Sequence, residues 1–178
     1  MRASGYNVEV EFALREFQRE DFDRLWRIDQ ECFPPGIAYS RMELAAYIRL
    51  RGAFTMVAER VSDNGGQAVD RSKVLGFIVA QANRRGVGHI LTIDVPPSSR
   101  RFGVGSKLLA TAEDRLRASA CRTVVLEAAV DNVSALAFYK RHAYSIVKTI
   151  PRYYSNGVDA FVLEKELHSS SGESKLLL

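Results

Sequence analysis

The segment Ile93-Asp-Val-Pro-Pro-Ser-Ser-Arg-Arg-Phe-Gly-Val-Gly-Ser-Lys107 decides the fold. An apolar stretch ends at Val95, two prolines follow, and two glycines precede a stretch of helical periodicity that begins at Ser106. This order predicts a strand, a glycine-containing turn and the first turn of a helix. The first amides of a helix lack intrahelical partners and carry the positive end of its dipole, and glycine lets an anion come close to them. The segment is therefore built to hold a phosphate group.

Two common phosphate-binding motifs do not fit this segment. A Walker A loop needs G-x-x-x-x-G-K-[ST], and the residues before Lys107 do not provide it. The dinucleotide fingerprint needs a third glycine at the position that Leu108 occupies. A different family of phosphate-binding turns must account for the two glycines.

The rest of the chain predicts one α/β domain with the order β-α-α-β-β-β-α-β-α-β-β. Alternating and apolar stretches predict seven strands, at Val8–Phe17, Phe54–Val61, Val74–Ala82, His89–Val95, Thr123–Val130, Tyr144–Ile150 and Ala160–Leu167. Helical periodicity and a capping box at Ser40 predict four helices, at Asp21–Phe33, Ser40–Leu50, Ser106–Ala118 and Asn132–His142. Asn64-Gly65 predicts a hairpin with a long tip. The polar residues 168–178 are expected to form a mobile tail.

The composition excludes several classes of protein. With 178 residues, 47% of them hydrophobic and 26% charged, the chain has the length and balance of one globular domain. No apolar run reaches the ~20 residues of a membrane span, and no signal peptide is recognisable, so we expect a cytoplasmic protein without a membrane partner. Cys32 and Cys121 lie far apart, so we expect neither a disulfide framework nor a metal site. The net charge of +4 suits an anionic ligand or nucleic acid and does not by itself distinguish between them.

Two motifs in the expected order resemble the signatures of the GNAT acyltransferases. The first is R-x-x-G-x-G at Arg100, Gly103 and Gly105, and the second is N-x-x-A-x-x-F-Y, which runs from Asn132 to Tyr139. The resemblance covers about residues 8–167 and is closest to the RimI-type protein N-terminal acetyltransferases, whose motifs are echoed by Leu126-Glu127-Ala128 and Arg152-Tyr153-Tyr154. It implies a single GNAT domain over residues 1–167, with a mixed, mostly antiparallel central sheet flanked by about four helices.

The resemblance also implies that the cofactor is acetyl-CoA. Backbone amides of the glycine turn would hold the diphosphate, two arginines would add charge, and the end of the preceding strand would pair with the pantetheine arm. Asp94 departs from the small or apolar residue common at its position, and it either caps the turn or alters the amine site. The cofactor-binding residues expected are Ile93, Asp94, Val95, Arg100, Arg101, Phe102, Gly103, Val104, Gly105, Ser106, Asn132 and Tyr139.

Three residues are candidates for proton transfer. Glu127 is a carboxylate in an otherwise apolar strand, which favours a general base over its alternative, a structural salt bridge to an arginine. Tyr139, twelve residues later, is a candidate acid for the leaving thiolate, or a ring packed in the core. His89 begins a strand and is either a second candidate base or an exposed histidine. We expect His142 and His168 at the surface.

Two loops are candidates for the acceptor site, and by the resemblance they face each other across a groove. They contribute Phe33, Pro34 and Tyr39 from one side, and Tyr153 and Tyr154 from the other. The favoured function is acetyl transfer to a protein N-terminal α-amino group by direct attack in a ternary complex, with a ribosomal protein as one candidate acceptor. The alternatives are a small amine or lysine acceptor, or a non-catalytic acyl-CoA-binding domain.

Partners other than the acceptor follow from the absence of further motifs. A basic nucleic-acid-binding module using Arg84, Arg85, Arg100 and Arg101 is an alternative, but no nucleic-acid motif accompanies these arginines, so no nucleic-acid partner is expected. We expect a monomer or a weak homodimer.

Overall fold

The structure is a computed structural model that describes residues 10–61 and 73–167. Its strands are β1 (Phe12–Glu16), β2 (Ala53–Arg60), β3 (Val74–Ala82), β4 (Val87–Asp94), β5 (Thr123–Ala129), β6 (Ser145–Ile150) and β7 (Ala160–Glu166). Its helices are α1 (Phe22–Cys32), α2 (Arg41–Ile48), α3 (Val104–Ala118) and α4 (Val133–Arg141), with short 3-10 turns at Arg19–Asp21 and Pro97–Ser99.

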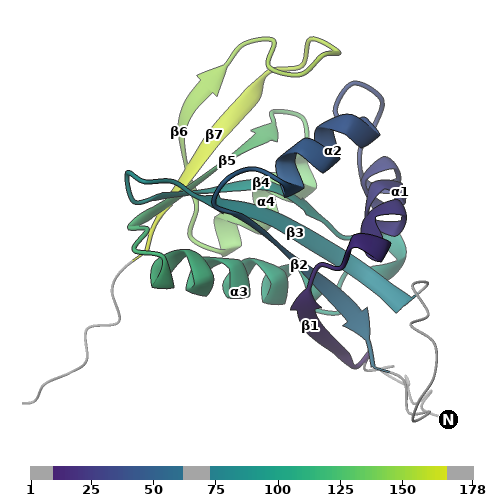
Figure 1. The fold of residues 1–178 in the computed structure, drawn as a ribbon. Coiled ribbons are helices and arrows are strands. Elements are labelled where there is room, and N and C mark those ends of the chain that lie inside the picture. The colour runs from purple at the N-terminus through teal and green to yellow at the C-terminus, as the bar shows by residue number, and fades with distance from the viewer. Residues whose placement is uncertain (1–9, 62–72, 168–178) are drawn as a thin grey trace, which may run out of the picture.

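All seven strands form one sheet in the order β1-β2-β3-β4-β5-β7-β6 (Figure 1). Every neighbouring pair is antiparallel except β4 and β5, which are parallel. The expected fold class, a single α/β domain with a mixed and mostly antiparallel sheet and four helices, is confirmed.

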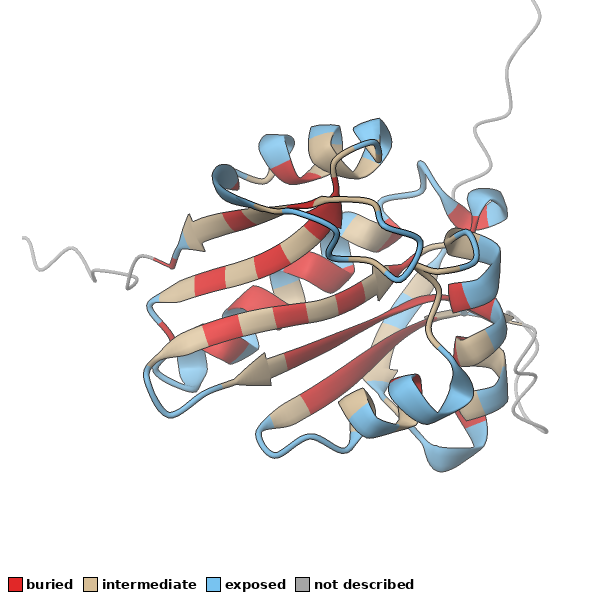
Figure 2. Ribbon diagram, turned by 90° about the horizontal axis from the view of Figure 1, so that it is seen from above, coloured by how far each residue is buried: buried red, intermediate tan, exposed pale blue. Residues whose placement is uncertain are grey.

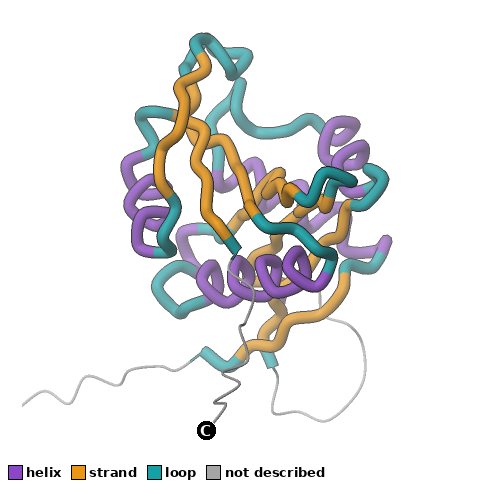
Figure 3. The backbone as a smooth tube through the Cα atoms, turned by 90° about the vertical axis from the view of Figure 1, so that its left-hand side faces the viewer, coloured by secondary structure: helices purple, strands orange, loops and turns teal. Residues whose placement is uncertain are grey.

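The helices cover the sheet from both sides (Figure 3). Leu25, Ile28 and Leu44 of α1 and α2 pack with Val57 and Phe77 in one fully buried cluster. A larger cluster on the other face holds the inward residues of α3 and the aromatic residues of α4. Figure 2 shows buried residues concentrated along the central strands, as expected of a sheet enclosed between two helical layers.

Each predicted element is present, and the differences lie at element ends. Helix α3 begins at Val104, two residues before the predicted start, because Gly103 in the left-handed region (φ 80°) already ends the turn. Strand β1 begins at Phe12 instead of Val8. The antiparallel pairing of β2 with β3 is confirmed, whereas Asn64-Gly65, the tail 168–178 and His168 lie outside the described residues. In the described part of the chain, no helix has the length and apolarity needed to cross a membrane.

The capping box of α2 provides a test of local stability. Ser40 Oγ accepts a hydrogen bond from the Glu43 amide (3.2 Å), and the Glu43 carboxylate accepts one from the Ser40 amide (2.8 Å). Ser40→Ala removes the first bond and is expected to lower the free energy of unfolding by about 1 kcal/mol in urea denaturation. Ser145→Ala on the exposed strand β6 is the control, and an equal loss in both variants would contradict the capping role.

Candidate active site

A cavity of about 900 Å³ opens where β4 and β5 separate. The two strands pair from Val87↔Thr123 to Ile90↔Leu126, and beyond that point both continue without pairing to each other. The walls come from the end of β4, the end of β5, the start of α3, helix α4 and two loops. This volume is within the range of small-molecule and cofactor sites.

The glycine turn forms one end of this cavity. Arg101 and Gly103 both have left-handed φ angles (69° and 80°), and α3 starts directly afterwards. In the described part of the chain, the amides of residues 101–106 donate to no backbone carbonyl, whereas the Lys107 amide already donates to the Gly103 carbonyl. A run of amides without partners at a helix N-terminus is an anion-binding arrangement.

The side chains of this turn divide into two groups. Arg100, Arg101 and Ser106 line the cavity, and Arg100 Nε also donates to the Val95 carbonyl (2.9 Å). Phe102 is 42% exposed and does not line the cavity, so only its backbone amide is available there. The predicted cofactor contact of Phe102 can therefore involve only its main chain.

His142 differs from its expected surface position. It is half-buried; its Nε2 lies 3.0 Å from Ser106 Oγ, and its Nδ1 lies 2.8 Å from the Phe138 carbonyl. The imidazole thus connects the end of α4 with the first turn of α3. Arg141, beside it in sequence, lines the cavity and was not singled out from the sequence.

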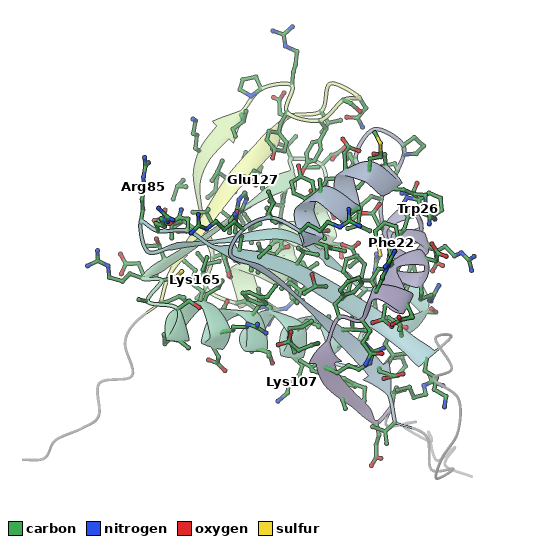
Figure 4. All side chains as sticks on the ribbon, in the orientation of Figure 1. Phe22, Trp26, Arg85, Lys107, Glu127 and Lys165 are labelled. Carbon is green, nitrogen blue, oxygen red and sulfur yellow. The ribbon has the colours of Figure 1, made fainter. Side chains whose placement is uncertain are left out.

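Glu127 and His89, two alternative bases in the sequence, are hydrogen-bonded to each other. His89 Nε2 lies 2.7 Å from Glu127 Oε2, and the two side chains are 32% and 19% exposed. Glu127 lines the cavity and His89 does not. Figure 4 labels Glu127, the member of the pair that faces the cavity. The sequence offered an arginine as the salt-bridge partner of Glu127. Among the described residues the partner is His89 instead.

Tyr139 and Asn132 position α4 against the same cavity. Tyr139 is 7% exposed, contacts the rings of Phe138 and Tyr144 edge-on, and lines the cavity. Burial raises the pKa of Tyr139, so the phenol keeps its proton throughout the neutral range. Asn132 Oδ1 accepts from the Ala135 amide (3.1 Å), which caps α4, while its side chain also borders the cavity.

The two predicted acceptor loops meet over the cavity. Ser155 Oγ donates to the Gly36 carbonyl (3.0 Å), which joins the loop after α1 to the loop between β6 and β7. Phe33, Pro34, Tyr39 and Tyr154 line the cavity, and their role at the acceptor stays a prediction. Tyr153 does not line it: this residue is 46% exposed and packs edge-on against Tyr154 at 5.0 Å. The Tyr153 side chain therefore lies outside the cavity wall.

The Asp94 side chain does not enter the cavity but is fully buried on the α1 face of the sheet. There it meets Asp29 of α1, also fully buried, and the two carboxyls form a hydrogen bond when one is protonated. With both ionised, Asp29 Oδ1 and Asp94 Oδ2 would have no donor among the described residues. The backbone of Asp94 stays a predicted contact of the pantetheine arm, whereas its side chain pairs with the Asp29 carboxyl.

The acid pair connects β4 to the acceptor loop. Asp29 Oδ2 accepts from the Tyr39 amide (2.8 Å), and the Tyr39 hydroxyl donates to the Leu91 carbonyl of β4 (3.1 Å). Thr92 donates to Asp94 from the same strand. Burial raises the pKa of Asp29 to about 6, and burial together with the Asp29 charge raises the pKa of Asp94 well above its ordinary value. The pair therefore retains one proton at pH values at which ordinary aspartates are already ionised.

This retained proton predicts a pH-dependent stability. The unfolded chain releases it above about pH 4, so the native state binds more protons and stability falls as pH rises toward the pKa of the folded pair. The slope is at most about 1.4 kcal/mol per pH unit for one proton. Asp94→Asn supplies a permanent amide donor, so its free energy of unfolding should fall less steeply in urea titrations between about pH 5 and pH 8.

Asp114→Asn is the matched control, because the Asp114 side chain is 77% exposed on α3. This control should keep the slope of the parent chain. Parallel curves for Asp94→Asn and the parent chain would show that the acid pair holds no extra proton.

Comparison with known proteins gives the family. Residues 6–144 match the model of the Acetyltransferase (GNAT) family. An uncharacterized N-acetyltransferase of Methanocaldococcus jannaschii, MJ1530, is 30% identical over 89% of this chain and 94% of its own length. An N-alpha-acetyltransferase of Sulfolobus acidocaldarius is 26% identical over 89% and 95% of the two chains. The crystal structure of Ard1 from Thermoplasma volcanium superposes with a TM-score of 0.76 at 27% identity, covering 90% of this chain and all of that one. The chain therefore belongs to the GNAT family of acetyltransferases, and it is an N-acetyltransferase whose cofactor is acetyl-CoA.

Proposed function

We propose that the chain acetylates the α-amino group of protein N-termini, by direct attack of the amine on acetyl-CoA in a ternary complex. One observation carries the proposal: a single cavity joins the free amides of residues 101–106 to Glu127 and to the two contacting acceptor loops. The N-alpha-acetyltransferase name of the Sulfolobus relative supports the same acceptor class.

The residues present fit acetyl-CoA. The unpartnered amides of residues 101–106 suit the diphosphate, and Arg100 and Arg101 add positive charge beside them. Beyond Ile90, the edge of β4 that faces β5 pairs with no strand of the described residues, so this edge is open to the amides of the pantetheine arm, apart from the Leu91 and Val95 carbonyls, which accept from Tyr39 and Arg100. Asn132 and Tyr139 border the same space. When bound, acetyl-CoA supplies the acetyl group as a thioester.

Glu127 takes the proton from the attacking amine in this proposal. Its carboxylate lines the cavity, and His89 holds it from outside the cavity wall, so His89 acts as a positioning residue. An α-amine has a pKa near 8, so a modest base suffices. Tyr139 donates its phenol proton, directly or as a hydrogen bond, to the sulfur that leaves when the carbon–sulfur bond breaks.

The contact between the two loops favours a chain terminus over an internal lysine. The hydrogen bond from Ser155 to Gly36 connects the two loops across the groove. The end of an extended peptide enters such a groove more readily than a lysine side chain in the middle of a polypeptide. Phe33, Tyr39 and Tyr154 give the acceptor end apolar and aromatic walls. Such walls suit a peptide better than a polyamine, which would require clustered carboxylates.

The finer assignments belong to the same proposal. The motifs Leu126-Glu127-Ala128 and Arg152-Tyr153-Tyr154 support placement with the RimI-type branch, and a ribosomal-protein N-terminus is one acceptor to test. We also propose that residues 1–167 are the catalytic domain, that the chain acts in the cytoplasm, and that it is a monomer or a weak homodimer.

Cofactor binding should depend on the backbone of the turn more than on one side chain. A Cβ at Gly105 would lie 3.5 Å from the Phe138 ring and 3.7 Å from Val95, so the branches of Gly105→Val would fill space within the cavity. We expect calorimetry with acetyl-CoA to show loss of binding for Gly105→Val and only a few-fold weakening for Arg101→Ala. Thr111→Val, elsewhere on α3, is the control for a new valine. Equal, unchanged affinity of both test variants for acetyl-CoA would contradict diphosphate binding by the backbone of the glycine turn.

Turnover should depend on Glu127 and Tyr139 without loss of the fold. Glu127→Gln and Tyr139→Phe should each keep acetyl-CoA affinity and lower kcat by about 10²–10⁴-fold on a peptide acceptor. Higher pH should partly rescue Glu127→Gln, since the α-amine then deprotonates unaided. It should not rescue Tyr139→Phe, whose missing group acts at sulfur.

The acceptor is tested by a screen of short peptides that differ in their first two residues, with lysine peptides and spermidine included. Preference for a free N-terminus supports the proposal, and preference for lysine or spermidine overturns it. If His89→Ala shows the pH rescue and Glu127→Gln does not, the histidine is the base. Parent-rate turnover by all three variants would mean that no residue proposed here moves a proton.

A further inference from the structure

A second cavity, of about 510 Å³, lies at the opposite end of the parallel strand pair. It is bordered by the turn before β4, the end of α3, the turn before β5 and the end of β7. Because β4 and β5 run in the same direction, their starts meet here and their ends meet at the active-site cavity. The eight residues of β4 separate the two cavities by roughly 25 Å. We call this second cavity the arginine hollow.

Four of its lining residues are arginines: Arg84, Arg85, Arg117 and Arg122. They come from three segments of the chain, and in the described residues no carboxylate lines the hollow. Figure 4 shows Arg85 projecting from the tip of the turn between β3 and β4, away from the sheet. Arg100 and Arg101, which the sequence grouped with Arg84 and Arg85, line the active-site cavity instead.

Few carboxylates balance this charge. Arg117 pairs with Asp114 at 2.6 Å, one turn earlier on α3. Arg84, Arg85 and Arg122 form no ion pair with any residue that the structure describes. Like charges gathered at one place repel each other, so an anion bound among them would be stabilised.

The backbone beneath these arginines is fixed by hydrogen bonds. Asn83 Oδ1 accepts from the amides of Arg85 (2.8 Å) and Val87 (3.0 Å). The Arg122 amide donates to the Gly86 carbonyl (2.8 Å), and the Arg122 carbonyl accepts from the Leu167 amide (2.7 Å). The three segments are therefore held together, and the backbone from which the arginines project needs little ordering when a ligand binds.

The helix dipole explains only part of the cluster. Helix α3 ends at Ala118, and arginines in its last turn, such as Arg117, stabilise the negative end of its dipole. Arg84, Arg85 and Arg122 lie outside the helix, and its C-terminal carbonyls would repel an anion. Attraction for an anion must therefore come from the side chains.

We propose that the arginine hollow binds the phosphate groups of a nucleic-acid backbone. The planar guanidinium fork matches phosphate oxygens, and several such forks on one open surface suit a ligand with repeated phosphates. The lining contains no aromatic ring on which a base could stack, so binding is independent of base sequence. This proposal replaces the expectation from sequence that no nucleic acid is bound, and it does not rest on the proposed acceptor.

The test is fluorescence anisotropy of a labelled short RNA duplex with the full chain, at about 50 to 200 mM salt. The logarithm of the association constant should fall linearly with the logarithm of the salt concentration. Duplexes of unrelated sequence should bind with equal affinity. Arg84→Glu with Arg85→Glu should reduce affinity at least about tenfold and lower the salt slope by about two. Arg49→Glu with Arg51→Glu, an equal change of charge on exposed residues outside the hollow, is the matched control and should bind like the parent chain.

A competition arm identifies the source of the phosphate. Tripolyphosphate at the same phosphate concentration should compete poorly, because it spans fewer of the arginines than a duplex backbone. Equal competition would assign the hollow to a small polyphosphate and overturn the nucleic-acid proposal. Absence of binding by the parent chain, or equal loss in the two double variants, would also overturn it. Unchanged acetyl-CoA affinity of the Arg84→Glu, Arg85→Glu variant shows that the fold is intact.

Discussion

The separation of β4 from β5 determines where the cavity and the residues around it lie. The parallel pairing lasts from Val87↔Thr123 to Ile90↔Leu126 and then stops, although both strands continue. A register shift in β4, between the residues paired with Val79 and Ala80, places Leu91 outside the ladder at this point. The unpaired strand edges that result form the cavity walls, so the sheet itself provides backbone groups for a ligand. Glu127 faces this opening because it lies one residue beyond the last paired position.

Two polar pairs stabilise the geometry on either side of this opening. His89 and Glu127 connect β4 to β5 near the point of separation, and Asp29 and Asp94 connect β4 to α1 beneath it. A buried, unpaired carboxylate costs several kcal/mol, and sharing one proton avoids most of that cost for the aspartates. Asp29 of the same pair accepts a hydrogen bond from the Tyr39 amide, and the Tyr39 hydroxyl donates to β4, so the loop after α1 that lines the cavity and strand β4 form one hydrogen-bonded unit.

The sequence predicted the elements and the two motif regions, because periodicity, capping and glycine placement are local signals. It did not predict contacts that depend on strand register. His89 pairs with Val125 across the sheet, so Glu127, two residues further on, comes within hydrogen-bond distance, yet nothing local links residues 38 positions apart. The partner of the Asp94 side chain also depends on strand register. The shift at Leu91 alters which face the later residues of β4 present, and Asp94 turns toward α1.

Helix α3 shows why the two proposed anion sites differ in construction. Its N-terminus opens onto the active-site cavity, where free amides and the positive end of the dipole attract an anion without relying on side chains. Its C-terminus ends at the arginine hollow, where carbonyls and the negative end of the dipole oppose an anion. In this proposal, binding at the first site depends on the shape of the backbone, in which Gly103 takes a left-handed φ angle. Binding at the second depends on arginine charge, so it should be far more sensitive to salt than cofactor binding is.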